Sequence, residues 1–275
     1  MNNQVHSNIL CLVCGGKTRT INPMNAISFV HECLNCRHAF YSPPPEKSVL
    51  NKLYLDEKYY DEGPEVENRA VYLWERRFRS LAKSLPQRGG SVLDVGCGKG
   101  VFLQFAKTSG LKVYGTEYSA YTAKYAGEKY GIYPLISDLL EAKYESNFFD
   151  MITFWHVLEH LASPPYYIHE AGRIIKKGGK LVIELPNRDC FRTSLDKQIS
   201  QNRTHLQFFS KKSLECIIGN NGFKIVSMKY YDPRDYKNKI SSKIHHFLEE
   251  SIIRGIDSVT GKAIGSTIRV VAEKT

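Results

Sequence analysis

The sequence lacks any uninterrupted apolar run that approaches the length of a membrane-spanning helix. Its first residues also lack the basic and apolar regions of a secretory signal peptide, so we expect a cytoplasmic protein without a transmembrane segment. The seven cysteines are an odd number, which leaves one thiol over in a purely disulfide-bonded framework. The chain has 275 residues, 42% of them hydrophobic, which is enough for one large globular domain and a small second module.

Four of the cysteines occur as two Cys-x-x-Cys pairs separated by eighteen residues, the spacing of a zinc ribbon. Each pair forms a knuckle that directs two thiolates at one centre, and four thiolates close a tetrahedral site. We therefore predict one structural Zn²⁺ rather than reduced cysteines that only fill space. His31 and His38 flank the second knuckle and are alternative ligands. The predicted ligands are Cys11, Cys14, Cys33 and Cys36.

Three consecutive prolines after Ser42 prevent a helix from continuing, and they place a boundary at about residue 44. The ribbon is thus expected over 1–44. Apolar residues then recur at spacings of three and four, which predicts a helical segment over 45–88.

A second pattern begins at Val92, where an apolar strand enters a turn with glycines at 96, 98 and 100. The dinucleotide fingerprint is not met, because Val101 stands where its third glycine belongs. Strand and helix patterns then alternate, which predicts a doubly wound, mostly parallel Rossmann-like α/β sheet with ligands at the carboxyl ends of its strands. Two of these ends carry acids, Glu117 and Asp138, which taken singly are equally consistent with helix N-caps.

Glycines at alternate positions follow Asp94, and the predicted strands and their acidic ends come after them. This arrangement resembles class I S-adenosylmethionine (SAM) dependent methyltransferases of the ubiquinone-biosynthesis, methyltransferase-23-like type. The resemblance covers roughly 90–275 and implies a seven-stranded domain over 89–275. It also implies that Glu117 meets the ribose of SAM and Asp138 the adenine, and that the preceding segment covers the cofactor, with Tyr59, Tyr60 and Arg69 as lid candidates or core residues. The expected cofactor residues are Asp94, Gly96, Cys97, Gly98, Gly100, Glu117, Tyr118, Asp138, Leu139 and Trp155.

The segment from His156 to His160 matches the H-x-x-E-H string of inverted zinc peptidases. It follows a predicted strand instead of lying inside a long helix, and it contains the V-L-E-H tetrapeptide of the methyltransferases named above. Methyl transfer needs alignment and, for a hydroxyl or acidic carbon, removal of a proton. His156, His205 and His160 are therefore the candidate catalytic residues, with hydrogen-bonded structural roles as the alternative.

The expected acceptor is a small molecule or a glycan precursor. A net charge of +10 and the ribbon support an alternative, an RNA base, but the charge is spread along the chain and the Asn-Pro-Pro-aromatic signature of base N-methylation is absent. A second alternative is a SAM-binding protein without catalytic activity. An insert at about 230–265 has amphipathic helical spacing and is expected to shape the acceptor site or to form a homodimer, with a place on a membrane surface as the alternative.

Overall fold

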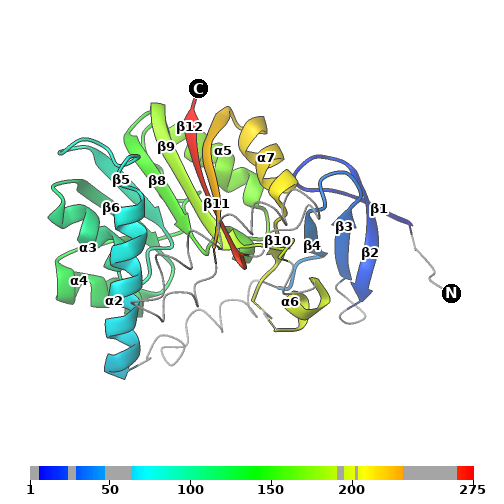
Figure 1. The fold of residues 1–275 in the computed structure, drawn as a ribbon, viewed down its shortest axis with the longest axis horizontal. Helices are drawn as coiled ribbons and strands as arrows, with labels where there is room; N and C mark the ends of the chain where they lie inside the picture. The colour runs from blue at the N-terminus through cyan, green and yellow to red at the C-terminus, as the bar shows by residue number, and fades with distance from the viewer. Residues whose placement is uncertain (1–5, 24–28, 47–62, 191–194, 202–203, 232–264) are drawn as a thin grey trace, which may run out of the picture.

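The computed structural model describes residues 6–23, 29–46, 63–190, 195–201, 204–231 and 265–275, and the description below refers to these ranges (Figure 1). The strands of the amino-terminal part are β1 (His6–Leu10), β2 (Lys17–Pro23), β3 (Phe29–Cys33) and β4 (Ala39–Ser42). The later strands are β5 (Ser91–Val95), β6 (Lys112–Glu117), β7 (Leu135–Ile136), β8 (Phe149–Trp155), β9 (Ile175–Pro186), β10 (Gln207–Phe208), β11 (Phe223–Tyr231) and β12 (Thr267–Lys274). The helices are α2 (Gly63–Ser80), α3 (Val101–Thr108), α4 (Ala120–Tyr130), the 3-10 turn η2 (Leu158–His160), α5 (Pro164–Ile174), α6 (Leu195–Gln201) and α7 (Lys211–Asn220).

The larger sheet has seven strands in the order β11-β12-β9-β8-β5-β6-β7. Strands β5 to β9 are parallel to one another, and β12 runs antiparallel to both of its neighbours, β9 and β11. The order reverses at β5, and such a switch point opens a crevice at the carboxyl ends of the strands. The predicted doubly wound, mostly parallel sheet is confirmed.

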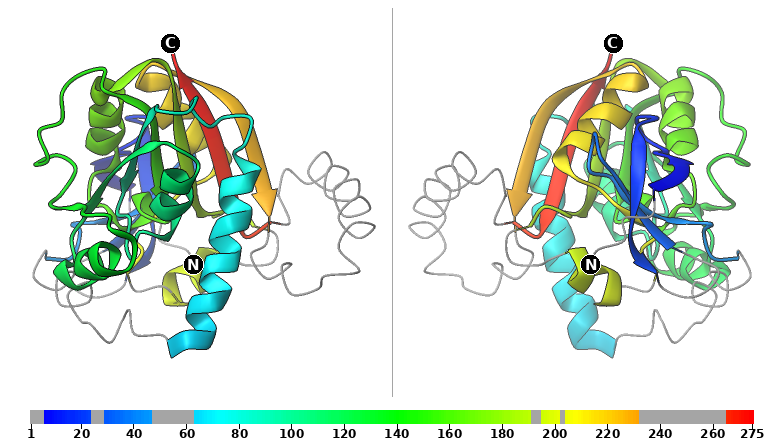
Figure 2. Two further views of the ribbon diagram at one scale, coloured as in Figure 1. Left: turned by 90° about the vertical axis from the view of Figure 1, so that its left-hand side faces the viewer. Right: turned by 90° about the vertical axis from the view of Figure 1, so that its right-hand side faces the viewer.

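Helices cover both faces of this sheet, as the alternation of side chains along each strand requires. Leu93 and Ile152 belong to the core beneath α5 and α7, whereas Val92 and Met151 belong to the core beneath α2 and α3. Figure 2 shows α2 on one face and α7 on the other. Strand β7 has only two residues and lies at the edge of the sheet, where Pro134 before it has no N–H to donate.

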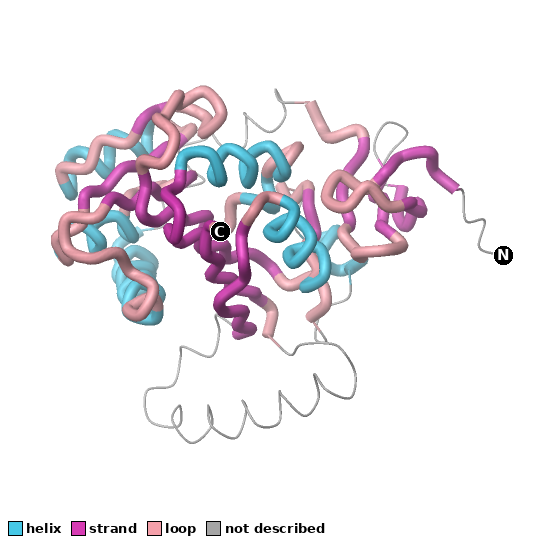
Figure 3. Tube along the Cα trace, turned by 90° about the horizontal axis from the view of Figure 1, so that it is seen from above, coloured by secondary structure: helices cyan, strands magenta, loops and turns pink. Residues whose placement is uncertain are grey.

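The smaller sheet is antiparallel and has the order β1-β2-β3-β4-β10. It lies at the opposite end of the molecule from α3 and α4 (Figures 1 and 3). Its fifth strand, β10, comes from a part of the chain far beyond the ribbon. Buried Cys11, Val13, Cys33 and Cys36 also join the core beneath α5 and α7, so the ribbon shares both a sheet and a hydrophobic core with the larger domain.

Two segments expected to carry function lie largely outside the described residues. Tyr59 and Tyr60 fall there, as does the side chain of Arg69, although its backbone lies within α2. The insert over 230–265 lies outside the described ranges apart from its first two residues and its last. Among the described helices, none combines the length and apolar character that a membrane crossing requires.

Candidate active site and metal centre

The glycine turn leaves β5 at the switch point of the sheet. Gly96 has a φ of 65°, and a Cβ there would lie 2.9 Å from a methyl carbon of Val157, so no other residue fits without displacement. Gly98 also has a positive φ of 53°, but a Cβ at Gly98 would meet nothing within 4 Å. The turn is therefore tight on the side of the protein and open at Gly98, as a cradle for a ligand against bare backbone requires.

Glu117, at the end of β6, faces this turn. One carboxylate oxygen accepts a hydrogen bond from the Gly98 N–H at 2.7 Å, and the other accepts from the Ser119 N–H at 2.8 Å. The side chain thus ties the glycine turn to the start of α4. A carboxylate that accepts two backbone hydrogen bonds is held in one orientation, beside the open face of Gly98.

Asp94 and Cys97 lie behind the turn. The Thr153 hydroxyl donates to Asp94 at 2.7 Å, and burial, with a smaller contribution from the charge of Glu117, raises the pKa of Asp94 to about 8. Cys97 is also buried, and burial raises the pKa of its thiol, so it stays protonated. Both residues support the turn from inside the protein.

The remaining expected cofactor residues lie at or just beyond the carboxyl ends of β6, β7 and β8. Asp138 accepts hydrogen bonds from the Leu140 N–H at 2.9 Å and from the Tyr167 hydroxyl at 2.5 Å. Leu139 is buried and Tyr118 is partly exposed. Trp155 is buried, and its indole N–H has no hydrogen-bond partner among the described residues. This unpaired donor and the open face of Gly98 fit a polar ligand such as SAM.

His156, the first residue after β8, has a strained backbone. Its φ is 54°, in the left-handed region that non-glycine residues rarely adopt, which is typical of functional sites. The ring is held between two acids: Nδ1 lies 3.1 Å from Glu159, and Nε2 lies 3.4 Å from Glu184. Burial by itself lowers the pKa of His156, but the hydrogen bonds and charges of these acids raise it to about 9. His156 is therefore protonated at neutral pH.

Glu184 is the centre of a buried charge cluster that the sequence analysis missed. Its side chain is fully buried and accepts from Arg77 at 2.9 Å and from Arg269 at 2.7 Å, in addition to its contact with His156. The pKa of Glu184 is lowered because these positive charges outweigh the effect of burial. The sequence signal for this cluster was an acid inside the apolar run of β9, because an unpaired carboxylate buried there would be very unfavourable.

Glu159, His160 and His205 form a second cluster beside His156. One ligand atom from each lies within 4.8 Å of the others, so the group has the composition to hold a divalent ion or to transfer a proton. The His160 ring, through Nδ1, bonds the Thr204 carbonyl at 3.0 Å, and the His160 and His205 ring centres are 4.9 Å apart. Burial lowers the pKa of His205 to about 4, although the charge of Glu159 acts in the opposite direction. His205 is therefore neutral at pH 7.

The four paired cysteines converge on one point of the ribbon. The sulfur of Cys11 lies 3.6 Å from that of Cys36, and the sulfur of Cys14 lies 3.5 Å from that of Cys33. Sulfurs around a tetrahedral zinc, with bonds of about 2.3 Å, lie roughly 3.8 Å apart, so this set fits such an ion with little movement. His31 and His38 are not part of this cluster; the Nε2 of His38 instead lies 2.9 Å from Gln207.

Comparison with known proteins gives a matching family and individual relatives. A family described as a methyltransferase domain matches residues 66–228. An uncharacterized protein of Methanocaldococcus jannaschii is 30% identical over 171 residues, which cover 61% of this chain and 80% of that protein. The ubiquinone biosynthesis O-methyltransferase of Thiobacillus denitrificans is 30% identical over 120 residues, 42% of this chain and 52% of the relative.

The fold has solved counterparts as well. The crystal structure of a SAM-dependent methyltransferase from Archaeoglobus fulgidus superimposes with a TM-score of 0.58 at 20% identity, covering 83% of this chain and all of that one. The switch point of the sheet, with its glycine turn and acidic strand ends, lies within the matched region. The chain therefore belongs to the methyltransferase domain family, and its relatives in sequence support that it is a SAM-dependent methyltransferase.

Proposed function

We propose that this enzyme methylates a small molecule or a glycan precursor, and that His205 removes the proton from the acceptor. The observation that carries this proposal is a half-buried, neutral histidine beside Glu159 and His160, close to the end of β8. The ubiquinone biosynthesis O-methyltransferase named above supports the small-molecule class. The labelling experiment described below tests which class of acceptor receives the methyl group.

We propose that SAM is bound by the residues that the sequence predicted for this role. SAM supplies a methyl group on a positively charged sulfur, so the protein itself need not activate the carbon. Gly96, Gly98 and Gly100 admit the cofactor to the backbone of the turn, and Glu117 receives its ribose hydroxyls. Asp94 and Cys97 hold the turn from behind, while Trp155 closes the inner wall. The adenine side is formed by Tyr118, Asp138 and Leu139.

We expect Glu117→Ala to weaken SAM binding about 10- to 150-fold, which corresponds to the roughly 1.5–3 kcal/mol of a lost charged hydrogen bond. Calorimetric titration with SAM measures the effect. Glu128→Ala is a matched control, because this glutamate lies on the exposed side of α4 and should leave the affinity unchanged. An affinity of the Glu117 variant within twofold of wild type removes this residue from the cofactor site.

The ionisation states distinguish the three candidate histidines. A general base needs a free lone pair at working pH, which neutral His205 has and protonated His156 lacks. His156 therefore orients Glu159, and His160 lies against the His205 ring. Glu159 places a negative charge beside the base and so stabilises the imidazolium that forms when His205 takes the proton.

The proposed reaction is a displacement at the methyl carbon, accompanied by one proton transfer. A bond forms between the acceptor atom and the methyl carbon, while the bond from that carbon to sulfur breaks and leaves its electron pair on sulfur. The proton of the acceptor passes to His205, and from there to solvent after the product leaves. The contribution of the protein is alignment and the reception of this proton.

Transfer of a radiolabelled methyl group from SAM tests the acceptor class. A cell extract is separated into a fraction of small molecules and sugar nucleotides and a fraction of RNA, and each is incubated with the enzyme. We expect the label in the small-molecule fraction. Label confined to RNA overturns the proposal in favour of base methylation, and SAM binding without labelling of any fraction favours a protein that binds SAM without catalytic activity.

We also propose that Cys11, Cys14, Cys33 and Cys36 hold one structural Zn²⁺. The distances between their sulfurs support this assignment, and backbone N–H groups of Val13 and Asn35 lie 3.4 Å from the sulfurs of Cys11 and Cys33. A site closed by four protein ligands leaves no position for a substrate, so the metal serves folding and not transfer.

A further inference from the structure

We propose that Gln207 is a positioning residue that couples the four-cysteine ribbon to the acceptor side of the active site. The role of the segment that it positions rests on the proposed function, in which His205 is the base. The coupling itself is a matter of hydrogen bonds and burial, and it can be tested without a known acceptor.

The ribbon and the acceptor side meet in one short strand pair. Gln207 and Phe208 of β10 pair antiparallel with Phe40 and Ala39 of β4. The Tyr41 N–H extends the pairing by donating to the Leu206 carbonyl at 3.1 Å. His205 is therefore the residue immediately before the segment that continues the sheet of the ribbon.

Gln207 uses both ends of its buried amide across this junction. Its NH₂ group donates to the carbonyls of Leu161 at 2.9 Å and Ala162 at 3.2 Å. Its oxygen lies 2.9 Å from Nε2 of His38, two residues after the last cysteine of the ribbon. Carbonyl oxygens only accept hydrogen bonds, so the amide nitrogen must face Leu161 and Ala162, and His38 must donate to the amide oxygen.

Further hydrogen bonds beside Gln207 hold two active-site segments against each other. The Leu206 N–H donates to the Glu159 carbonyl at 2.7 Å, and the His160 ring bonds the Thr204 carbonyl at 3.0 Å. Residues 159–162 and 204–207 are thereby joined along their length, with the His160 and His205 rings in contact. A displacement of Gln207 moves the proposed base relative to Glu159, and a misplacement of about 1 Å can cost about 10²-fold in rate.

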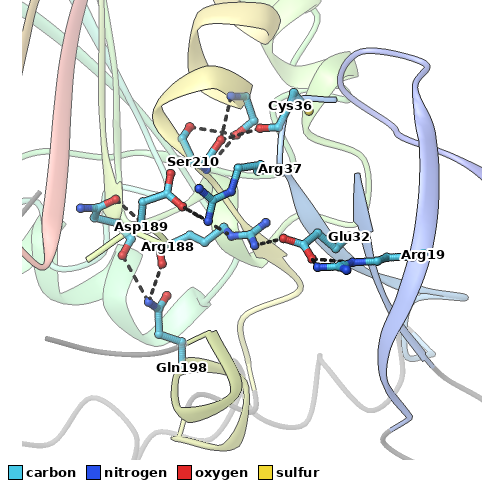
Figure 4. A network of polar contacts seen from close by, with 10 residues as sticks. Arg19, Glu32, Cys36, Arg37, Arg188, Asp189, Gln198 and Ser210 are labelled. Carbon is cyan, nitrogen blue, oxygen red and sulfur yellow. Dashed lines mark hydrogen bonds and ion pairs between the residues drawn. The ribbon is translucent and has the colours of Figure 1, made fainter. Parts of the chain in front are cut away.

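The ribbon side of the junction is anchored to the rest of the protein by buried polar contacts (Figure 4). Glu32 of β3 forms an ion pair with buried Arg188, which follows β9, and the Ser210 hydroxyl donates to the carbonyl of Cys36 at 2.6 Å. His38 is fully buried between the rings of Phe40 and Phe209. The position of the His38 N–H therefore depends on the cysteine knuckle that precedes it. Gln207, which accepts a hydrogen bond from this N–H, links the knuckle to the segments that contain His160 and His205.

Two variants of His38 and one of Gln207 test the coupling. His38→Phe keeps the ring and loses the donor, His38→Gln keeps a donor, and Gln207→Leu removes the amide. NMR signals of the histidine rings are followed through a pH titration, together with calorimetric binding of S-adenosylhomocysteine. Asn220→Ala is the matched control, because it removes a ribbon contact, to the Val13 carbonyl at 3.5 Å, that does not involve either active-site segment.

We expect Gln207→Leu and His38→Phe to shift the ring signals of His160 and His205 and to move the His205 midpoint from about 4 toward 6.5. Burial lowers the pKa of His205 most, and Glu159, His160 and His156 are the charged or titratable neighbours that also act on it. His38→Gln and Asn220→Ala should match wild type, and all four variants should bind S-adenosylhomocysteine within twofold of it. Unchanged ring signals in His38→Phe overturn the coupling, even if Gln207→Leu does not fold. They leave the role of His205 as base untouched, because that role is judged by turnover.

Discussion

Replacement of His205 with alanine is expected to lower the rate of methyl transfer about 10²- to 10⁴-fold, the contribution of a positioned general base. Affinity for SAM should stay near that of wild type, because the glycine turn and Glu117 belong to a different part of the sheet. Steady-state turnover on the labelled acceptor fraction, with calorimetric SAM binding measured in parallel, provides the test. His205→Gln should be as slow as the alanine variant, because an amide has no basic nitrogen.

The pH dependence of this reaction follows from the sign of the pKa shift. Burial lowers the pKa of His205 to about 4, so the base stays neutral far below pH 6.5 and the acid limb of kcat/KM should lie near pH 4. His169→Ala is a control on an exposed histidine of α5 and should change neither rate nor profile. A His205→Ala variant that retains most of its turnover refutes the role as base and leaves alignment alone as the source of catalysis.

Loss of the metal is expected to unfold the ribbon. The binding free energy of a structural zinc is about 10–16 kcal/mol at pH 7, which is comparable to the whole stability of a typical domain, about 5–15 kcal/mol. Cys33→Ser should therefore reduce the zinc content from close to one per chain to nearly none. Because Cys33 and Cys36 share a core with Phe209 and Leu214, acceptor turnover should be lost while SAM binding is largely retained.

Elemental analysis, amide hydrogen exchange of β1 to β4 and calorimetry with SAM measure these three effects. Cys216→Ser is the matched control, because this half-buried thiol lies outside the four-sulfur cluster and its replacement should leave the metal in place. Protein that is purified without chelators and carries no metal, yet has well-protected ribbon amides, contradicts the zinc assignment.

Much of the larger sheet could be read from local patterns. Strands β6 and β8 and helix α4 follow the alternation of strands and helices that the sequence predicted, because strand alternation, helical spacing and glycine stops are properties of neighbouring residues. The glycine turn and Glu117 were identified for the same reason. Their contact, the hydrogen bond from the Gly98 N–H to Glu117, follows from parallel strands whose carboxyl ends meet at one edge.

The ionisation of the candidate histidines could not be read in this way. His156 and His205 are the same residue type near the same strand ends, but one is protonated and the other neutral at pH 7. The difference arises from Glu159 and Glu184 around His156 and from burial around His205. Sequence spacing says nothing about the distance between a ring and a carboxylate on another strand, and this distance and the burial set the pKa.

The sequence by itself determined the sheet, the glycine turn with its acids, and the two cysteine pairs, since each is encoded within a short stretch of chain. Only the tertiary structure decided that β10 extends the ribbon sheet, that Glu184 gathers Arg77 and Arg269, and that Gln207 joins His38 to the segment after β8. These contacts join residues far apart in the chain. They form because strand order and packing bring distant segments together. The periodicity of the sequence indicates which residues are buried, but not which residues they contact.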